Sequence, residues 1–210
     1  MTTIDLEFAI VESRLSETWE ALAIQRTINE LANKEVNPSL NSELNRYSGF
    51  WRTINMSLQA TIFTGLFALL DENSSDSATF YSILRHAEGT NRHVALSGMA
   101  SRLTEMRTKY KTYRHKLFGH NDKNREDWAT RYNEAGFTWV SLEKDFEYLD
   151  HVFKVLMQLN KGDAVADEAT SRGLQFPHNL SRRKVSQQTE ELLRGLIVTS
   201  ALDSASPASL

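Results

Sequence analysis

The most regular feature of the sequence is an apolar seam within residues 92–118. Its members alternate steps of three and four residues without a miss: Leu96, Met99, Leu103, Met106, Tyr110, Tyr113 and Leu117. This spacing keeps every side chain on one face of an α-helix, whereas the two-residue repeat of a strand would divide them between two faces. The seam therefore predicts a long helix that packs lengthwise against neighbouring helices, as in a coiled coil.

Much of the remaining chain shows a similar spacing of apolar residues. Pro38, Pro177 and Pro207 all lie outside the periodic segments, which matters because a proline inside a helix costs about 3 kcal/mol. No segment has the strict alternation of a strand. The predicted helices cover residues 4–34, 42–70, 77–86, 92–118, 138–160 and 187–202. We therefore predict an all-α, up-and-down helical bundle with a C-terminal helical appendage.

Length and local composition suggest how the chain is divided. A chain of 210 residues is long enough for one domain or one and a half. We expect the bundle to cover residues 1–162, and residues 163–210 to hold a linker, the C-terminal helix and a disordered tail. The most apolar run, residues 60–70, is about half of the ~20 residues that span a bilayer. Since the N-terminus also lacks the basic region of a signal peptide, we expect a cytoplasmic protein that does not contact a membrane.

The composition excludes several classes of function. The chain has no cysteine, so disulfide scaffolds, thiolate metal sites and cysteine nucleophiles are ruled out. It also has no glycine-rich phosphate loop, no nucleophile elbow and no zinc-protease or EF-hand motif. We therefore expect neither a metal nor another cofactor.

One short stretch, from Tyr113 to Asp122, stands out from the rest. It reads Tyr-Arg-His-Lys-Leu-Phe-Gly-His-Asn-Asp and lies at the end of the seam helix, where Gly119 marks a common place for a helix to stop. Residues 102–116 hold six basic residues and one acidic residue, although the whole chain has a formal charge of -3. The sequence therefore predicts a local basic surface at this end of the helix.

Helical geometry places Arg114 and His120 on the two sides of the seam. Six residues at 100° per residue separate them by about 120° around an ideal helix. Both side chains would then flank whatever packs against the seam. A second copy of the bundle that docks there would bring two Arg–His pairs into one cleft.

These residues resemble the R-x(4–6)-H signature of the HEPN superfamily. Arg114 is followed by the polar residue His115, and His120 follows at the end of the long helix. The ending Gly-His-Asn-Asp is most similar to the AbiU-type abortive-infection branch, in which the motif reads histidine, any residue, aspartate. HEPN toxins that pair with a nucleotidyltransferase antitoxin usually have a tyrosine two positions after the histidine. Asp122 occupies that position here, which argues against that mode of regulation.

The resemblance implies a metal-independent endoribonuclease of a phage-defence or toxin–antitoxin system, with a site completed by dimerisation. A histidine, with a pKa of about 6.5, is suited to proton transfers near neutrality, and an arginine offers a permanently charged fork to phosphate oxygens. We assign Arg114 and His120 as catalytic residues, and His115, Lys116 and Asp122 as substrate-binding residues. The expected partners are RNA, a second copy of the chain, and an antitoxin or other defence protein.

Blander interpretations stay open. A helix C-terminus favours cations by about 0.3–1 kcal/mol each, which alone accounts for much of the basic stretch. A second interpretation is a non-catalytic module that binds RNA, a nucleotide or a protein in the same cleft. A third is that the bundle serves only as a scaffold. We expect Phe50, Trp51 and Phe63 to lie in the core, Tyr110 and Tyr113 to be packing residues, and the last helix to serve dimerisation or docking.

Overall fold

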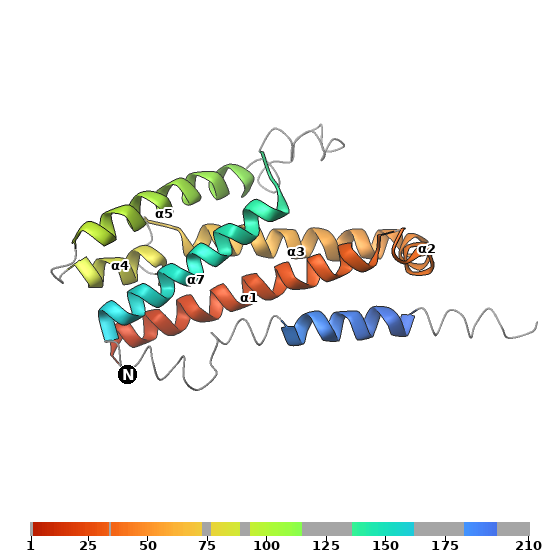
Figure 1. Cartoon of the computed structure of the whole chain (residues 1–210), viewed down its shortest axis with the longest axis horizontal. Helices are drawn as coiled ribbons and strands as arrows, with labels where there is room; N and C mark the ends of the chain where they lie inside the picture. The colour runs from red at the N-terminus through yellow and green to blue at the C-terminus, as the bar shows by residue number, and fades with distance from the viewer. Residues whose placement is uncertain are drawn as a thin grey trace, which may run out of the picture.

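In the computed structural model, every regular element of the described residues is a helix. The structure describes residues 2–33, 35–72, 77–88, 93–114, 136–161 and 183–196. The helices are α1 (Thr3–Leu31), α2 (Pro38–Arg46), α3 (Ser48–Leu69), α4 (Phe80–Glu88), α5 (His93–Tyr113), α7 (Trp139–Lys161) and a helix over residues 183–196. The predicted all-α bundle is confirmed (Figure 1).

Local side-chain chemistry explains where the first two helices begin. Thr2 caps α1 by accepting from the backbone N–H of Asp5 at 3.2 Å, and Asp5 accepts from the backbone N–H of Thr2 at 2.9 Å. Asn37 caps α2 by accepting from the N–H of Leu40, and Pro38 follows it at the first helical position. Both caps satisfy backbone donors that a helix leaves without an internal partner.

The single helix predicted over residues 42–70 is wrong, because the structure has two helices there. α2 starts at Pro38, earlier than predicted, and Tyr47 separates it from α3. The backbone of Tyr47 leaves the helical region at φ -110° and ψ 37°. Ser48 and Gly49 follow at once, and both are poorer helix formers than alanine, which favours a break at this point.

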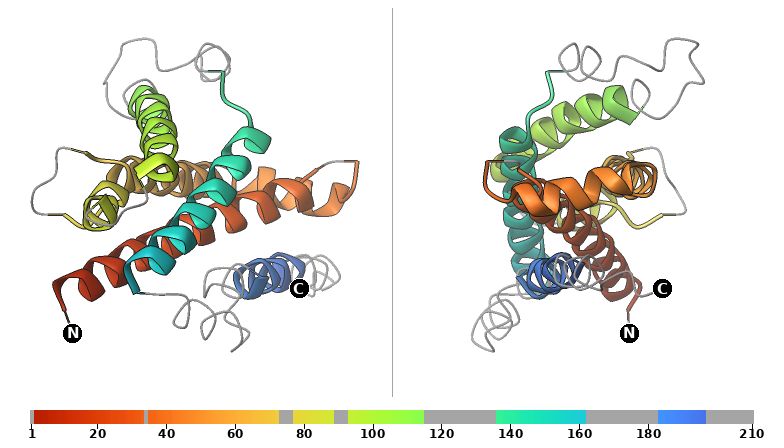
Figure 2. Two further views of the ribbon diagram at one scale, coloured as in Figure 1. Left: turned by 60° about the vertical axis from the view of Figure 1, so that its left-hand side comes forward. Right: turned by 90° about the vertical axis from the view of Figure 1, so that its right-hand side faces the viewer.

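The core lies among α1, α3, α4, α5 and α7. α1 and α3 run side by side in opposite directions, and α3 lies between α1 and α5 (Figures 1 and 2). Aromatic pairs join α1 to α7: the ring centroids of Phe8 and Phe153 are 5.6 Å apart, and those of Trp19 and Phe146 are 5.0 Å apart. The described seam residues of α5 face this core: Leu96, Leu103, Met106, Tyr110 and Tyr113 are buried, and Met99 is partly buried.

A small residue sets how closely α1 and α3 approach each other. A Cβ atom added to Gly65 of α3 would lie 2.4 Å from the Oγ1 atom of Thr18 and 3.3 Å from its Cβ atom. Thr18 is itself 2 % exposed, and its hydroxyl donates to the carbonyl of Arg14 in α1 at 2.6 Å. The two helices therefore meet where only glycine fits in α3.

A second, smaller cluster attaches the C-terminal helix to the bundle. Leu193 is fully buried against Ile28 of α1 and Leu40 and Leu44 of α2. The helix over residues 183–196 therefore docks on this chain, and its expected role in dimerisation stays a prediction. The division of the chain at residue 162 also stays a prediction.

Three aromatic side chains expected in the core have different surroundings. Phe63 is fully buried and Trp51 is partly buried against the second cluster. The expectation for Phe50 is wrong, since 60 % of its surface is exposed. It lies in the first turn of α3, with its ring edge-to-face on Trp51 at 5.3 Å. Among the described residues, no helix is long and apolar enough to cross a membrane.

Candidate functional site

The end of α5 carries the described part of the predicted site. Tyr110 and Tyr113 are 0 % and 2 % exposed, as expected of packing residues, and Arg114 directly after them is exposed. The seam thus turns its last described aromatic residues inward and leaves the guanidinium at the surface. This position agrees with the predicted placement of Arg114 beside the seam.

A stacking contact orients Arg114. Its guanidinium carbon lies 4.8 Å from the centroid of the Phe67 ring in α3. Arginine stacks readily on aromatic faces, and contact with the face of a ring leaves the N–H groups at its edge able to donate. The side chain is therefore positioned by an apolar contact that does not use up its hydrogen-bonding capacity.

Tyr113, the residue before Arg114, belongs to a cluster of aromatic rings from α3, α5 and the residues just before α7. The ring of Phe63 lies 5.7 Å from Tyr113 and 5.4 Å from Phe137, and Tyr113 and Phe137 are also 5.7 Å apart. All three pairs are edge-to-face, with interplanar angles of 73–81°. Such pairs stabilise the fold beyond the burial of their surface. They therefore hold the end of α5 against α3 and the residues just before α7.

Asp145 of α7 is the centre of a polar network with α5. One of its donors, Tyr110, lies one turn before Arg114. Its side chain is 3 % exposed, and its Oδ2 atom accepts from the hydroxyl of Tyr110 at 2.7 Å and from Lys109 at 2.6 Å. Its Oδ1 atom accepts from Arg102 at 3.2 Å. A buried carboxylate is costly unless it is paired and hydrogen-bonded, and this one satisfies both conditions. The network ties α7 to α5 between Arg102 and Tyr110.

The network changes the electrostatics of this end of the molecule. Arg102 and Lys109 pair with Asp145, and Arg107 pairs with Glu72 at 3.2 Å. Carboxylates of the same chain therefore partly neutralise the predicted basic surface. The six basic residues counted between residues 102 and 116 overstate its charge, because three of them are paired. Lys111 and Arg114 have no carboxylate partner among the described residues, so the cationic character concentrates near the end of α5.

The tyrosine hydroxyls beside the network are held in their neutral form. Burial, together with the charge of Asp145 and the hydrogen bond to it, raises the pKa of Tyr110 far above its ordinary value. Burial and the charge of Asp145 also raise the pKa of Tyr113. Tyr110 thus remains a hydrogen-bond donor to Asp145 over the whole physiological range.

The other predicted site residues, His115, Lys116, His120 and Asp122, lie outside the described residues. The distance between Arg114 and His120 therefore stays a prediction. Within the described ranges, no three histidine or acidic side chains come together in a way that would hold a metal ion.

The sequence analysis missed Asp145, although the sequence contains a signal for it. Asp145 follows Leu142 by three residues and precedes Phe146, so it lies at the border of the apolar stripe of α7. A carboxylate in that place predicts a buried partner from a neighbouring helix. In the structure, Lys109 and Tyr110 of α5 are those partners.

Comparison with known families decides the relationship that the motif suggested. The model of a HEPN family described as AbiU2 matches residues 7–187 of the chain. The chain belongs to the AbiU2 family of HEPN domains. The match includes the stretch from Arg114 to Asp122 and continues past residue 162 to the start of the C-terminal helix. No curated protein and no solved structure matches the chain.

In this AbiU2-type HEPN domain, the described features of the site all lie at the end of α5. Arg114 directly follows α5 with its guanidinium on Phe67 of α3, and the aromatic cluster and the Asp145 network both fix that end of α5. The abortive-infection family and the HEPN fold are therefore established for this chain.

Proposed function

We propose that this AbiU2-type HEPN domain is a metal-independent endoribonuclease whose active site forms where two copies of the chain meet. The observation that carries the proposal is the state of Arg114. It is exposed, stacked on Phe67 and without a carboxylate partner among the described residues, while Arg102, Arg107 and Lys109 before it are paired. Phosphate binding requires a positioned guanidinium with free donors, and no carboxylate of the described residues occupies the donors of Arg114.

In the proposed reaction, His120 and Arg114 have complementary roles. His120 takes the proton from a ribose 2′-hydroxyl or gives one to the leaving 5′-oxygen, and the histidine of the second copy does the other. Arg114 binds the phosphate oxygens and stabilises the additional negative charge of the transition state. The 2′-oxygen displaces the 5′-oxygen from phosphorus, so the products are a 2′,3′-cyclic phosphate and a free 5′-hydroxyl.

Three residues of the motif are assigned to substrate binding. His115 and Lys116 contact the RNA backbone, and Asp122 orients an imidazole. The proposed biological setting is phage defence or a toxin–antitoxin pair, which the AbiU2 family membership supports.

Mixed dimers test whether the site is shared between two copies. We expect Arg114→Ala and His120→Ala each to lose RNA cleavage and toxicity in cells, with unchanged helix content. Co-expression of the two variants would give mixed dimers with one arginine and one histidine in the shared cleft. These should recover part of the cleavage, because the phosphate is bound again and one of the two proton transfers is again catalysed. Sedimentation would show a dimer for all three preparations.

Two results would contradict the proposal. RNA binding that weakens with salt, but without turnover in the wild type or under phage challenge, would favour a non-catalytic binding module. Unchanged phenotypes for both single variants would favour a scaffold.

A further inference from the structure

Three cations at the end of α5 follow one another on a single face of the helix. Arg107, Lys111 and Arg114 are separated by steps of four and three residues, so they are neighbours along the helix surface. Both ends of this row lie beside α3, because Arg107 bonds Glu72 just beyond α3 and the guanidinium of Arg114 lies on Phe67. Lys111 is the middle member of the row.

The charge of Lys111 is not neutralised by the described part of the chain. Arg107, one turn before it, bonds Glu72 at 3.2 Å. Glu105 is the one acidic residue in the sequence of α5, and it bonds Arg102 at 2.9 Å. Lys111 itself is exposed and has no carboxylate partner among the described residues. Its ammonium group is therefore available to a ligand.

The exposed residues beside Lys111 on the outer side of α5 are neutral. They are Thr108 and Thr112, and each hydroxyl donates to a backbone carbonyl of α5 at 3.0 Å. A cation in neutral surroundings attracts an anion more strongly than a cation beside a carboxylate, because no opposite charge offsets its field.

The position of Lys111 relative to Arg114 suits two neighbouring phosphates. Side chains three residues apart on a helix have Cβ atoms about 5–6 Å apart. A single strand of RNA carries one phosphate per nucleotide, so two cations at this spacing can contact consecutive phosphates. In the proposed reaction, Arg114 and His120 act on the same phosphate. Because Lys111 precedes Arg114 in the chain and His120 follows it, Lys111 is suited to the next phosphate along the strand.

We propose that Lys111 is a further substrate-binding residue that holds the phosphate next to the scissile one, so that efficient substrates carry two consecutive phosphates. This inference rests on the ribonuclease activity proposed above. The planar fork of Arg114, fixed on Phe67, takes the scissile phosphate. The ammonium group of Lys111 is a compact charge on a flexible stem and reaches the second phosphate. A dinucleotide with a single phosphate leaves Lys111 unused.

Three dinucleotide substrates test the proposal: one with only the scissile phosphate, one with a further 5′-phosphate and one with a further 3′-phosphate. For the wild type, one of the two phosphorylated forms should have a kcat/KM about ten-fold higher or more, mainly through a lower KM, because it gains a charge-assisted hydrogen bond. Lys111→Gln should cleave all three about as efficiently as the wild type cleaves the form without the extra phosphate. The end that gives the gain shows the direction of the bound strand.

Three results would overturn the proposal. The wild type would show equal kcat/KM for all three substrates, or Lys111→Gln would retain the gain from the second phosphate. The third result is a loss of cleavage by Lys111→Gln on the dinucleotide without an extra phosphate, since Lys111 would then act on the scissile phosphate itself.

Binding of a short single-stranded RNA in a His120→Ala background makes the test independent of cleavage. Each phosphate contact contributes about −0.7 to the slope of log K against log salt for a single strand, so Lys111→Gln should make the slope shallower by about that amount. An unchanged slope would overturn the assignment of Lys111. A wild type that cleaves no RNA would instead contradict the proposed function, and the slope would still report on Lys111.

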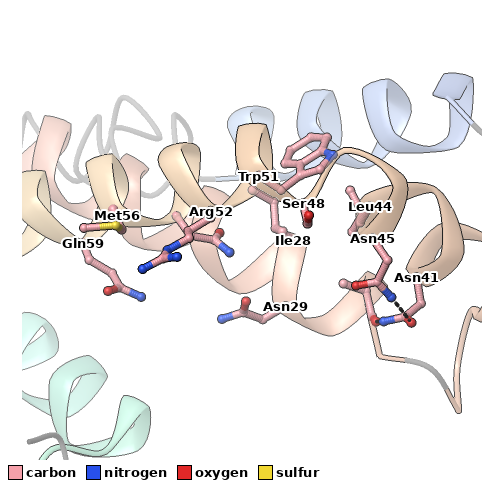
Figure 3. Close-up of a pocket in the computed structure, with 12 residues that line it drawn as sticks. Ile28, Asn29, Asn41, Leu44, Asn45, Ser48, Trp51, Arg52, Met56 and Gln59 are labelled. Atoms are coloured by element: carbon pink, nitrogen blue, oxygen red, sulfur yellow. Dashed lines mark hydrogen bonds between the residues drawn. The ribbon is translucent and has the colours of Figure 1, made fainter. Parts of the chain in front are cut away.

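Arg52 supplies the control for the loss of one exposed cation. It has no carboxylate partner among the described residues, and Figure 3 shows it among neutral side chains in the cleft between α1, α2 and α3. It precedes Phe67 in α3 by 15 residues, or roughly 22 Å of helix, so it lies far from Arg114. Arg52→Gln should leave the substrate preference and the salt slope unchanged. An effect as large as that of Lys111→Gln would show that position on α5 does not matter, and would overturn the proposal.

Discussion

Asp145 has almost no exposed surface, and three donors from α5 converge on its carboxylate. Its cationic partners differ in exposure, since the side chain of Lys109 is 26 % exposed and that of Arg102 is 49 % exposed. The least exposed donor is the hydroxyl of Tyr110. At the scale of single residues, this neutral donor and its buried acceptor connect α5 and α7 most tightly.

Tyr110→Phe removes that donor without changing the shape of the ring. We expect the free energy of unfolding near pH 7 to fall by about 1–3 kcal/mol, because a buried carboxylate loses a hydrogen bond. Urea unfolding measures the change. Tyr81→Phe is the control: its hydroxyl bonds the hydroxyl of Thr104 at 2.9 Å, so only a neutral pair is lost and the effect should be smaller.

The same variant has a predicted pH dependence. Burial raises the pKa of Tyr110 in the folded chain above the unfolded value of about 10. Above that pH the unfolded chain loses a proton that the folded chain keeps, so the free energy of unfolding decreases as the pH rises. Tyr110→Phe should therefore show a shallower decrease above about pH 10 than the wild type. An equal slope would contradict the account of Tyr110.

At the scale of the helices, the sequence predicts what depends on periodicity. The seam of α5 and the helical character of α1, α3 and α7 follow from repeats of apolar residues, and the structure confirms them. The break at Tyr47 could not be predicted in this way, because Leu44, Tyr47 and Trp51 keep a helical spacing of three and four residues across it. The position of Asp145 at the border of the α7 stripe marks it as a buried carboxylate, but the identity of its partners could not be predicted, because it depends on tertiary packing.

Gly65→Ala tests the close approach of α1 and α3. The added methyl group would collide with the buried, β-branched side chain of Thr18, so we expect a loss of about 1–3 kcal/mol, although alanine is the better helix former. Adding Thr18→Ala should recover part of the loss in the double variant. A Gly65→Ala protein as stable as the wild type would show that the helices can separate at little cost.

Leu193→Ala tests the docking of the C-terminal helix. Leu193 is fully buried against Ile28, Leu40 and Leu44, so its truncation should cost about 2–4 kcal/mol. Leu192 provides the control, since it is 64 % exposed and Leu192→Ala should change stability by no more than about 0.5 kcal/mol. Thermal or urea unfolding compares the two. Equal effects would mean that Leu193 does not hold the helix on the bundle.

At the scale of the whole molecule, the fold fixes the position of Arg114, one of the two residues of the proposed catalytic pair. α3, α5 and α7 fix the end of α5 through the aromatic cluster and Asp145, and Arg114 emerges there on the ring of Phe67. The sequence identified this end because the family motif combines residue types with a position on a helix. It could not predict the pairing of the neighbouring cations, because Asp145 lies 31 residues further along the chain than Arg114.

The most direct test of the ribonuclease is the cleavage of RNA in the presence of EDTA by four proteins: wild type, Arg114→Ala, His120→Ala and His151→Ala. His151 is an exposed histidine of α7 and serves as the matched control. We predict that wild type and His151→Ala give 2′,3′-cyclic phosphate ends, and that His120→Ala is slower by about 100-fold or more. Arg114→Ala should show a comparable loss. Full cleavage by His120→Ala, or cleavage that stops on chelation, would contradict the account.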